Sequence, residues 1–382
     1  MLAFDNCEYK KAKGLFAIAI ENDPTHPENY FFLGQSLFLC KEIQPAIESL
    51  TTFIYLKKPG LTENTDTDDS MNVANAYDTL GQCYEAENNS DDALPCYEIA
   101  TKTNSKCASG WNNMGLYYLK SAEYSLEQDP PKQTVAKINE LFKGAQLFIK
   151  KALTLFASNP GFLHSMAKWF EKYTDMIQLI ISDTIRAQEE ITAHFELAIK
   201  FYQNARITCG DKDLILRDAI KTNYAECYAQ FGHHLYRSKK YPEAQKLYLK
   251  AIELDPDHLN AISQMGMCYS KQGNYTEARN YFTGILGETS DKQTLADAHY
   301  NIAYTYRIDK NWIKAEEFIA KAMQLSPMDE DILEEQRALA ESKMQAMYIS
   351  SPQILFASTN KVTTIWNEEP EPDNQTGKTF GS

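Results

Sequence analysis

Apolar residues recur at helical spacing along most of this 382-residue chain. The recurring pattern is a small residue, a large apolar residue four positions later, and a small or large apolar residue three positions after that. Residues separated by four and seven positions share one face of a helix, so each copy predicts a helix with one buried face. The pattern occurs eight times, at Ala12/Phe16/Ala19, Ala46/Leu50/Phe53, Ala93/Tyr97/Ala100, Ala145/Ile149/Ala152, Ala198/Tyr202/Ala205, Ala244/Tyr248/Ala251, Ala278/Phe282/Ile285 and Ala315/Ile319/Ala322.

A second helical pattern precedes six of these copies. It reads YFFLGQSL at 30–37, YDTLGQCY at 77–84 and WNNMGLYY at 111–118, and it begins again at 228, 262 and 299. The two patterns together predict pairs of antiparallel helices, in which small residues allow close approach of the backbones and large residues fill the space around the contact. Because each pair leaves an unburied face, the pairs must stack on one another. The sequence therefore predicts an all-α fold.

The three C-terminal copies, at 228–256, 262–290 and 299–327, are the most regular. Gly232 and Gly266 lie 34 residues apart, and Pro256 and Pro327 end two of the units, since proline cannot continue a helix. This arrangement resembles the tetratricopeptide repeat (TPR), a helix pair that stacks into a solenoid. The resemblance implies a right-handed α-solenoid of about eight TPR-like helix pairs. Spacings of 34, 47, 52, 53, 46, 34 and 37 residues between successive copies indicate lengthened central repeats.

The same patterns predict how the chain is divided. We expect TPR-like repeats at 1–58, an acidic loop at 59–73, central repeats with insertions at 74–221, three regular repeats at 222–327, a capping helix at 328–349 and a partly disordered tail at 350–382. Residues 161–221 should form two long helices with a break near Ser182–Asp183. Most of the first helix of the first repeat is missing, so the chain is a fragment, its start is misassigned, or another element covers Phe16 and Ile20.

Composition and charge narrow the class of partner. The chain has 38 Lys and Arg against 52 Asp and Glu, a formal charge of −14, which argues against binding to a phosphate backbone. No stretch approaches the roughly 20 apolar residues that cross a bilayer. The eight cysteines include no CxxC pair, so we interpret them as reduced, packed thiols in a cytoplasmic protein.

We find no motif that indicates catalysis, a cofactor or a metal. The only histidine cluster is His233–His234, and adjacent helical residues point to different faces. GKT at 377–379 lacks the preceding glycine of a phosphate-binding loop, because Pro372 occupies that position. We therefore predict a protein that is not an enzyme.

The resemblance implies a binding groove lined by set positions of each first helix. These positions hold Asn75, Asp78, Gln82, Asn112, Asn113, Gln230, His233, Asn260, Gln264, Tyr300, Asn301 and Tyr304. Amides recur at one of them, and an amide can pair with the backbone of an extended peptide, which is similar to the asparagine ladder of O-linked N-acetylglucosamine transferases. The alternative is a solvated polar face. The cationic clamp that co-chaperone TPR proteins use for acidic C-termini is not expected, because Phe31, Gln35, Thr79, Ser109 and Asn113 occupy its positions.

An acidic segment lies at residues 61–92, which hold nine Asp and Glu and neither Lys nor Arg. Its most exposed acids are expected to be Glu63, Asp66, Asp68, Asp69, Asp91 and Asp92. Such a patch would speed encounter with a basic partner. The alternative is that these acids only keep the surface soluble.

Three hypotheses for function follow. The first is a non-enzymatic scaffold or adaptor that binds a peptide or helix of a protein partner in the groove, with neither nucleic acid nor membrane insertion involved. The second is a constitutive subunit of a larger assembly, motivated by the exposed Phe16/Ile20 face of an incomplete first repeat. The third is the regulatory arm of an enzyme whose catalytic part is absent.

Overall fold

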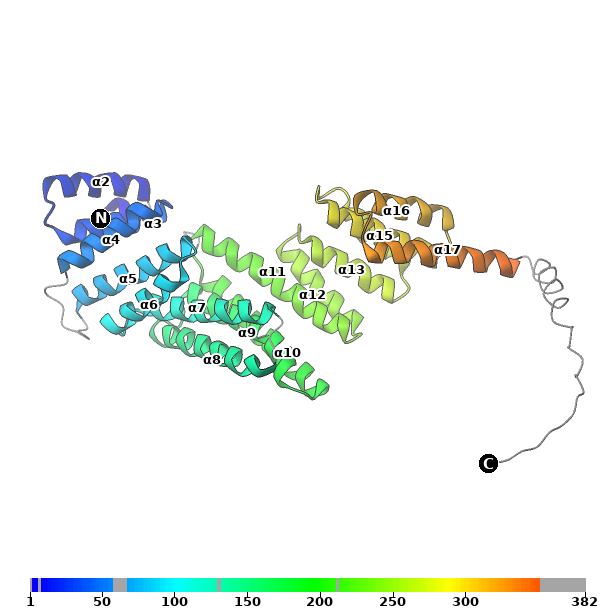
Figure 1. Cartoon of the computed structure of the whole chain (residues 1–382), viewed down its shortest axis with the longest axis horizontal. Helices are drawn as coiled ribbons and strands as arrows, with labels where there is room; N and C mark the ends of the chain where they lie inside the picture. The colour runs from blue at the N-terminus through cyan, green and yellow to red at the C-terminus, as the bar shows by residue number, and fades with distance from the viewer. Residues whose placement is uncertain (1, 6–7, 58–66, 129–131, 211–212, 351–382) are drawn as a thin grey trace, which may run out of the picture. The chain divides into compact units, whose positions relative to one another are not determined.

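The computed structural model describes residues 2–5, 8–57, 67–128, 132–210 and 213–350, and within these ranges all regular structure is helical (Figure 1). The helices are α1 (Leu2–Asp5), α2 (Tyr9–Asn22), α3 (Pro27–Leu39), α4 (Ile43–Lys57), α5 (Asp68–Ala86), α6 (Ser90–Thr103), α7 (Ala108–Glu127), α8 (Lys132–Leu155), α9 (Pro160–Ile180), α10 (Thr184–Thr208), α11 (Leu214–Arg237), α12 (Tyr241–Leu254), α13 (Leu259–Lys271), α14 (Tyr275–Ile285), α15 (Lys292–Ile308), α16 (Trp312–Leu325) and α17 (Glu330–Ser350). The predicted all-α class is confirmed.

The eight predicted apolar patterns fall on the even-numbered helices from α2 to α16. Their leading alanines are at most 1% exposed, and the large residues Leu50, Tyr97 and Tyr202 are fully buried. Each pattern therefore forms the buried face of a second helix. Within the units, the preceding odd-numbered helix packs against it in the pairs α1–α2, α3–α4, α5–α6, α7–α8, α9–α10, α13–α14 and α15–α16. Consecutive helices pair along the chain, as a repeat built from helix pairs requires.

Glycines on the first helices explain how closely the two helices of a pair approach. A Cβ atom added at Gly34 would lie 2.6 Å from Cγ of Leu50, and one added at Gly266 would lie 2.7 Å from Cε1 of Phe282. Real Cβ atoms do not approach carbon this closely, so any side chain at these positions would push the helices apart. The glycines of the motif are therefore required for packing.

The chain divides into two compact units, which we describe separately. Unit 1 comprises residues 1–232 and 253–256, and unit 2 comprises residues 233–252 and 257–382. The core of unit 1 includes one cluster around Leu50 and Phe53 and another around Phe142 and Trp169. The core of unit 2 includes clusters around Phe282 and Ile302 and around Ile319 and Leu339.

The acidic loop predicted at 59–73 ends earlier than expected, because α5 begins at Asp68. The Thr67 side chain accepts a hydrogen bond from the Ser70 amide, and the Ser70 hydroxyl accepts one from the Thr67 amide. This reciprocal capping box starts a helix. The Thr, Asp and Ser content that predicted a loop belongs in part to a helix cap. Residues 58–66 lie outside the described part of the chain, as do residues 351–382 of the predicted tail.

Another element covers Phe16 of α2, which is 7% exposed. Its ring stacks on Phe32 of α3 at a centroid distance of 5.4 Å, and Ala3 and Phe4 of α1 belong to the same cluster. This packing agrees with the expectation that another element covers Phe16.

The predicted break in the long central segment is confirmed. Helix α9 ends at Ile180 and α10 begins at Thr184. The carboxylate of Asp183 accepts hydrogen bonds from the amides of Ile185 and Arg186. Since a helix leaves its first amides unpaired, this cap fixes where α10 starts.

Candidate binding surface on the first helices

Six polar side chains on the neighbouring helices α5 and α7 form what we call the Asp78 cluster. They are Asn75, Asp78 and Gln82 on α5, and Ser109, Asn112 and Asn113 on α7. Figure 1 shows these helices in unit 1, and they pack directly against each other. Five of the six were predicted as groove residues, and the structure brings those five together.

Asp78 is the centre of the cluster. Nδ2 of Asn113 donates to Oδ1 of Asp78 at 2.9 Å, and Nε2 of Gln82 donates to Oδ2 at 3.3 Å. Ser109 also hydrogen-bonds the carboxylate. Ser109 was named above only as a clamp position that holds no cation. Its position one helical turn before Asn113 could have indicated that it lies in the same cluster.

The cluster is partly open and partly closed. Asn75, Gln82, Ser109 and Asn113 are half-buried, whereas Asp78 is 4% exposed and Asn112 is 7% exposed. Burial differs because residues on the α5–α7 contact side are covered by the partner helix, while their neighbours reach the surface.

Burial raises the pKa of Asp78 to about 6, although the hydrogen bonds from Ser109, Asn113 and Gln82 act in the opposite direction. The nearby carboxylate of Glu85 raises it further. Charged forms are disfavoured where water is excluded. Tyr97 and Cys107 also lie close enough to Asp78 for its charge to raise their own pKa values.

Asn112 leaves an acceptor without a partner. Its Nδ2 donates to Oδ1 of Asn113 at 3.4 Å, but its buried Oδ1 has no hydrogen-bond partner among the described residues. A buried acceptor without a donor costs about 1–3 kcal/mol. The orphan oxygen therefore identifies a position where a donor is missing.

The other predicted groove residues lie apart from this cluster. Gln230 of unit 1 donates to Oε1 of Glu226 at 3.0 Å. In unit 2, His233 and Asn260 are exposed, and Gln264 is half-buried with its Oε1 buried and unpartnered.

On α15 of unit 2, the predicted groove residues Tyr300, Asn301 and Tyr304 are half-buried. Nδ2 of Asn301 donates to the carbonyl of Asp297 in its own helix at 2.9 Å. The guanidinium of Arg307 lies 5.3 Å from the ring centre of Tyr304. These three side chains lie on one helix. The hydrogen bond of the Asn301 amide stays within that helix and does not reach a neighbouring one.

A second polar cluster was missed by the sequence analysis. Glu171 of α9 is 4% exposed, and the hydroxyl of Tyr202 on α10 donates to its Oε2 at 2.7 Å. Burial raises the pKa of Glu171 to about 7, against the effect of Lys172. Lys172 also lies 3.5 Å from Glu123. The sequence around Glu171 shows a helical pattern of apolar residues. That pattern does not indicate that an acid within it is buried.

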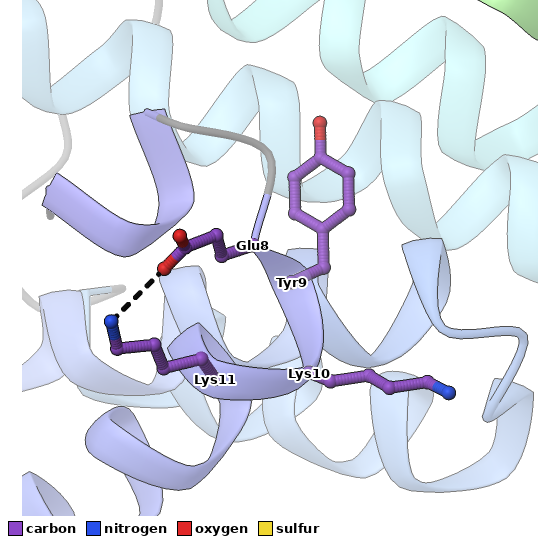
Figure 2. A pocket seen from close by; sticks show the side chains of 4 residues that line it. All are labelled: Glu8, Tyr9, Lys10 and Lys11. Carbon is purple, nitrogen blue, oxygen red and sulfur yellow. Dashed lines mark ion pairs between the residues drawn. The ribbon is translucent and has the colours of Figure 1, made fainter.

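A shallow pocket lies at the start of α2, lined by Glu8, Tyr9, Lys10 and Lys11 (Figure 2). The ion pair between Lys11 and Glu8 spans 3.1 Å, and both side chains are at least half exposed. Because Lys11 and Glu8 are solvated and pair with each other, we do not regard this pocket as a ligand site.

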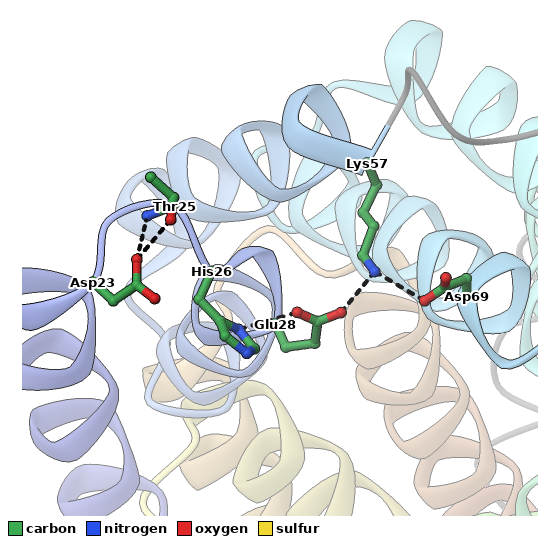
Figure 3. Close-up of polar contacts among 6 residues, drawn as sticks. All are labelled: Asp23, Thr25, His26, Glu28, Lys57 and Asp69. Carbon is green, nitrogen blue, oxygen red and sulfur yellow. Dashed lines mark hydrogen bonds and ion pairs between the residues drawn. The ribbon is translucent and has the colours of Figure 1, made fainter.

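The acidic segment is partly neutralised. Asp68, Asp69, Asp91 and Asp92 are exposed and lie in the first turns of α5 and α6, where negative charge favours the helix. Nζ of Lys57 lies 2.7 Å from Oε1 of Glu28 and 2.9 Å from Oδ1 of Asp69 (Figure 3). Glu63 and Asp66 lie outside the described residues.

The described cysteines behave as packing groups. Cys83, Cys96 and Cys107 are buried free thiols, and burial raises their pKa values to about 12, 11 and 11. Such thiols stay protonated and are poor nucleophiles. Within the described residues, no group of three His, Cys, Asp or Glu is arranged to hold a metal ion. None of the described helices has both the length and the apolar character needed to span a bilayer.

Three solved structures illustrate what the chain resembles. PilF of Pseudomonas aeruginosa is 14% identical, with 69% of this chain and 97% of that chain covered and a TM-score of 0.43. YrrB, described as a TPR protein with an unusual peptide-binding site, is 19% identical, with coverages of 64% and 100% and a TM-score of 0.39. PilW, described as a type IV pilus biogenesis factor, is 16% identical, with coverages of 68% and 97% and a TM-score of 0.41. Scores below 0.5 carry no functional argument.

The match to a family model is more direct. Residues 224–284 match the tetratricopeptide repeat family, and they contain the first of the three regular repeats and most of the second. No curated protein matches the chain. The helix pairs and the family match agree, and residues 224–284 of this chain belong to the tetratricopeptide repeat family.

Proposed function

We propose that this chain is a non-enzymatic scaffold that binds an extended segment of a protein partner on its first helices. The TPR fold indicates a protein–protein interaction role in general terms. The finer proposal concerns where the partner lies and what it contacts. Rigid helices lower the cost of ordering the bound surface, because little of the receptor must be immobilised.

One observation carries the proposal, namely the pair of unpartnered amide oxygens at predicted groove positions. Oδ1 of Asn112 and Oε1 of Gln264 are both buried and lack donors among the described residues. Backbone amides of an extended peptide are donors that occur in every sequence. Asn112 lies in unit 1 and Gln264 in unit 2, and in either unit a bound peptide amide would supply the donor that the described residues do not.

The alternative of a constitutive subunit has less support. It was motivated by an exposed Phe16 face, but Phe16 is buried against α1 and α3. We therefore keep the peptide-binding scaffold as the single proposed function. The cytoplasmic location inferred from the cysteines stays a prediction.

The test is selection of peptides from a random-sequence display library on the full chain, followed by affinity measurement with the selected peptides. Gln264→Lys and Asn113→Lys each replace a half-buried amide with a longer cation that cannot accept a hydrogen bond. Each should weaken binding at least about tenfold, the loss of one to two hydrogen bonds.

Gln188→Lys is the matched control, because Gln188 is an exposed amide on α10. It should bind the selected peptides as the wild type does. Recovery of no peptide, or equal affinity in all three variants, would refute the proposed binding surface.

A further inference from the structure

The Asp78 cluster contains a buried carboxylate whose hydrogen-bond donors are all neutral. Its partners are the amides of Gln82 and Asn113 and the hydroxyl of Ser109. The charged residue that affects it, Glu85, is another acid. Buried carboxylates are normally paired with a cation. Among the residues that the structure describes, no cation pairs with this one.

The orphan oxygen of Asn112 belongs to the same hydrogen-bonded chain. Asn112 donates to Asn113 at 3.4 Å, and Asn113 donates to Asp78 at 2.9 Å. Asn112 is more than nine-tenths buried, and its Oδ1 is unpartnered. A carboxylate without a paired cation and an amide oxygen without a donor therefore occur in one hydrogen-bonded cluster.

The helices that carry the cluster, and α6 between them, hold few cations, whereas α8 on the other side of α7 holds five lysines. Helix α5 contains neither Lys nor Arg, and α6 and α7 contain one lysine each, Lys102 and Lys120. Lys102 lies 3.4 Å from Glu98 on its own helix, and Lys120 is exposed. The field of α5 and α6 thus favours an incoming positive charge and opposes a carboxylate.

We propose that the Asp78 cluster receives a cationic side chain, a lysine ammonium or an arginine guanidinium, of the polypeptide that this protein binds. The proposal rests on the proposed function and names the chemistry of one contact within it. The cation would donate to Asp78 and to Oδ1 of Asn112, and hydrogen bonds between ions are shorter and stronger than those from neutral amides.

Access to Asp78 runs through side chains that can move. The bond from Gln82 is long, at 3.3 Å, and the Gln82 side chain is half-buried. A guanidinium or ammonium that replaces the Gln82 amide exchanges a weak neutral donor for a charged one. Asn113 can keep its shorter bond to the other carboxylate oxygen, so the cluster need not be dismantled.

The experiment uses the peptides selected on the wild-type chain. We expect them to share Lys or Arg at one fixed position, and replacement of that residue by Gln to weaken binding by about tenfold to a hundredfold, as for hydrogen bonds to charged groups. Asp78→Asn in the full chain should cause a similar loss for the basic peptide and little change for its Gln version.

Asp218→Asn is the matched control, because it removes the same charge from an exposed position on α11, outside the acidic segment, and should leave the preference for the basic peptide intact. If Asp78→Asn does not fold, Asn112→Leu provides the second test. It keeps the branched shape of the side chain, removes the orphan oxygen and should weaken binding of the basic peptide severalfold.

Two outcomes would overturn the inference, and they are distinguishable from failure of the proposed function. Selected peptides without a shared basic position, with affinity still sensitive to Gln264→Lys, would refute the cation site but leave the scaffold proposal intact. Failure to recover any peptide would refute both. A shared basic position that is indifferent to both Asp78→Asn and Asn112→Leu would place the cation elsewhere.

Discussion

Glu171 is a carboxyl group buried between α9 and α10, held by the hydroxyl of Tyr202. Burial raises its pKa from 4.5 to about 7. Because the pKa is higher in the folded protein than in the unfolded chain, folding favours the protonated form. This stabilisation is complete below about 4.5 and is lost as the pH rises through about 7.

We therefore predict that Glu171→Gln is more stable than the wild type at high pH. The difference in free energy of unfolding should reach roughly 3 kcal/mol at about pH 8 and nearly vanish at about pH 4. Urea unfolding of both proteins at the two pH values measures it. Glu189→Gln, an exposed change on α10, should show no such dependence, and a constant difference for Glu171→Gln would contradict the argument.

Some properties of single residues follow from the local sequence, and others depend on which helices pack together. The second-helix alanines could be predicted from sequence, because their burial follows from helical periodicity alone. The burial of Asp78 could not, since it depends on which residues of α7 lie against α5. The bond between Tyr202 and Glu171 joins positions 31 apart, and local patterns do not fix which first helix a second helix meets.

At the scale of one helix pair, glycine sets the separation of α13 and α14. We predict that Gly266→Ala lowers the free energy of unfolding by about 1–3 kcal/mol, because its methyl group would overlap the ring of Phe282. Thermal or urea unfolding of the full chain measures this loss.

Gly284→Ala on α14 is the control for helix propensity. Nothing lies within 4 Å of a Cβ added there, so the change should stabilise the protein by up to about 1 kcal/mol. Equal effects of the two substitutions would show that close packing at Gly266 is unimportant.

Element boundaries were predicted where a strong local cap exists and misplaced where composition was ambiguous. Asp183 marks the start of α10, and the predicted break is confirmed. Residues 68–73 were predicted as loop but belong to α5, because Thr67 and Ser70 cap each other. The same residue types favour loops and helix caps, since both use side-chain oxygens to bond free amides.

At the scale of the whole molecule, each helix is stabilised mainly by its neighbours along the stack. Helices inside a unit have partners on both sides, whereas α17 ends unit 2 and packs only on α15 and α16 among the described helices. Local opening should therefore be easiest at the ends.

We predict that amide hydrogens of α17 exchange faster than those of α15, and those of α2 faster than those of α7. Hydrogen exchange followed by mass spectrometry on the full chain resolves these segments. Uniform protection across α2, α7, α15 and α17 would mean that the molecule opens as one cooperative unit, contrary to a nearest-neighbour stack.

The sequence by itself determined the repeat, the eight second helices and the all-α class. Helical periodicity and small–large packing positions are local properties of the chain, so they can be recognised without the tertiary structure. It also placed five of the six residues of the Asp78 cluster on one predicted surface. Only the tertiary structure decided that Asp78 and Asn112 are buried, that Asn112 lacks a donor and that Glu171 meets Tyr202. Burial and pairing depend on which helices pack together, and that information is distributed over the whole fold.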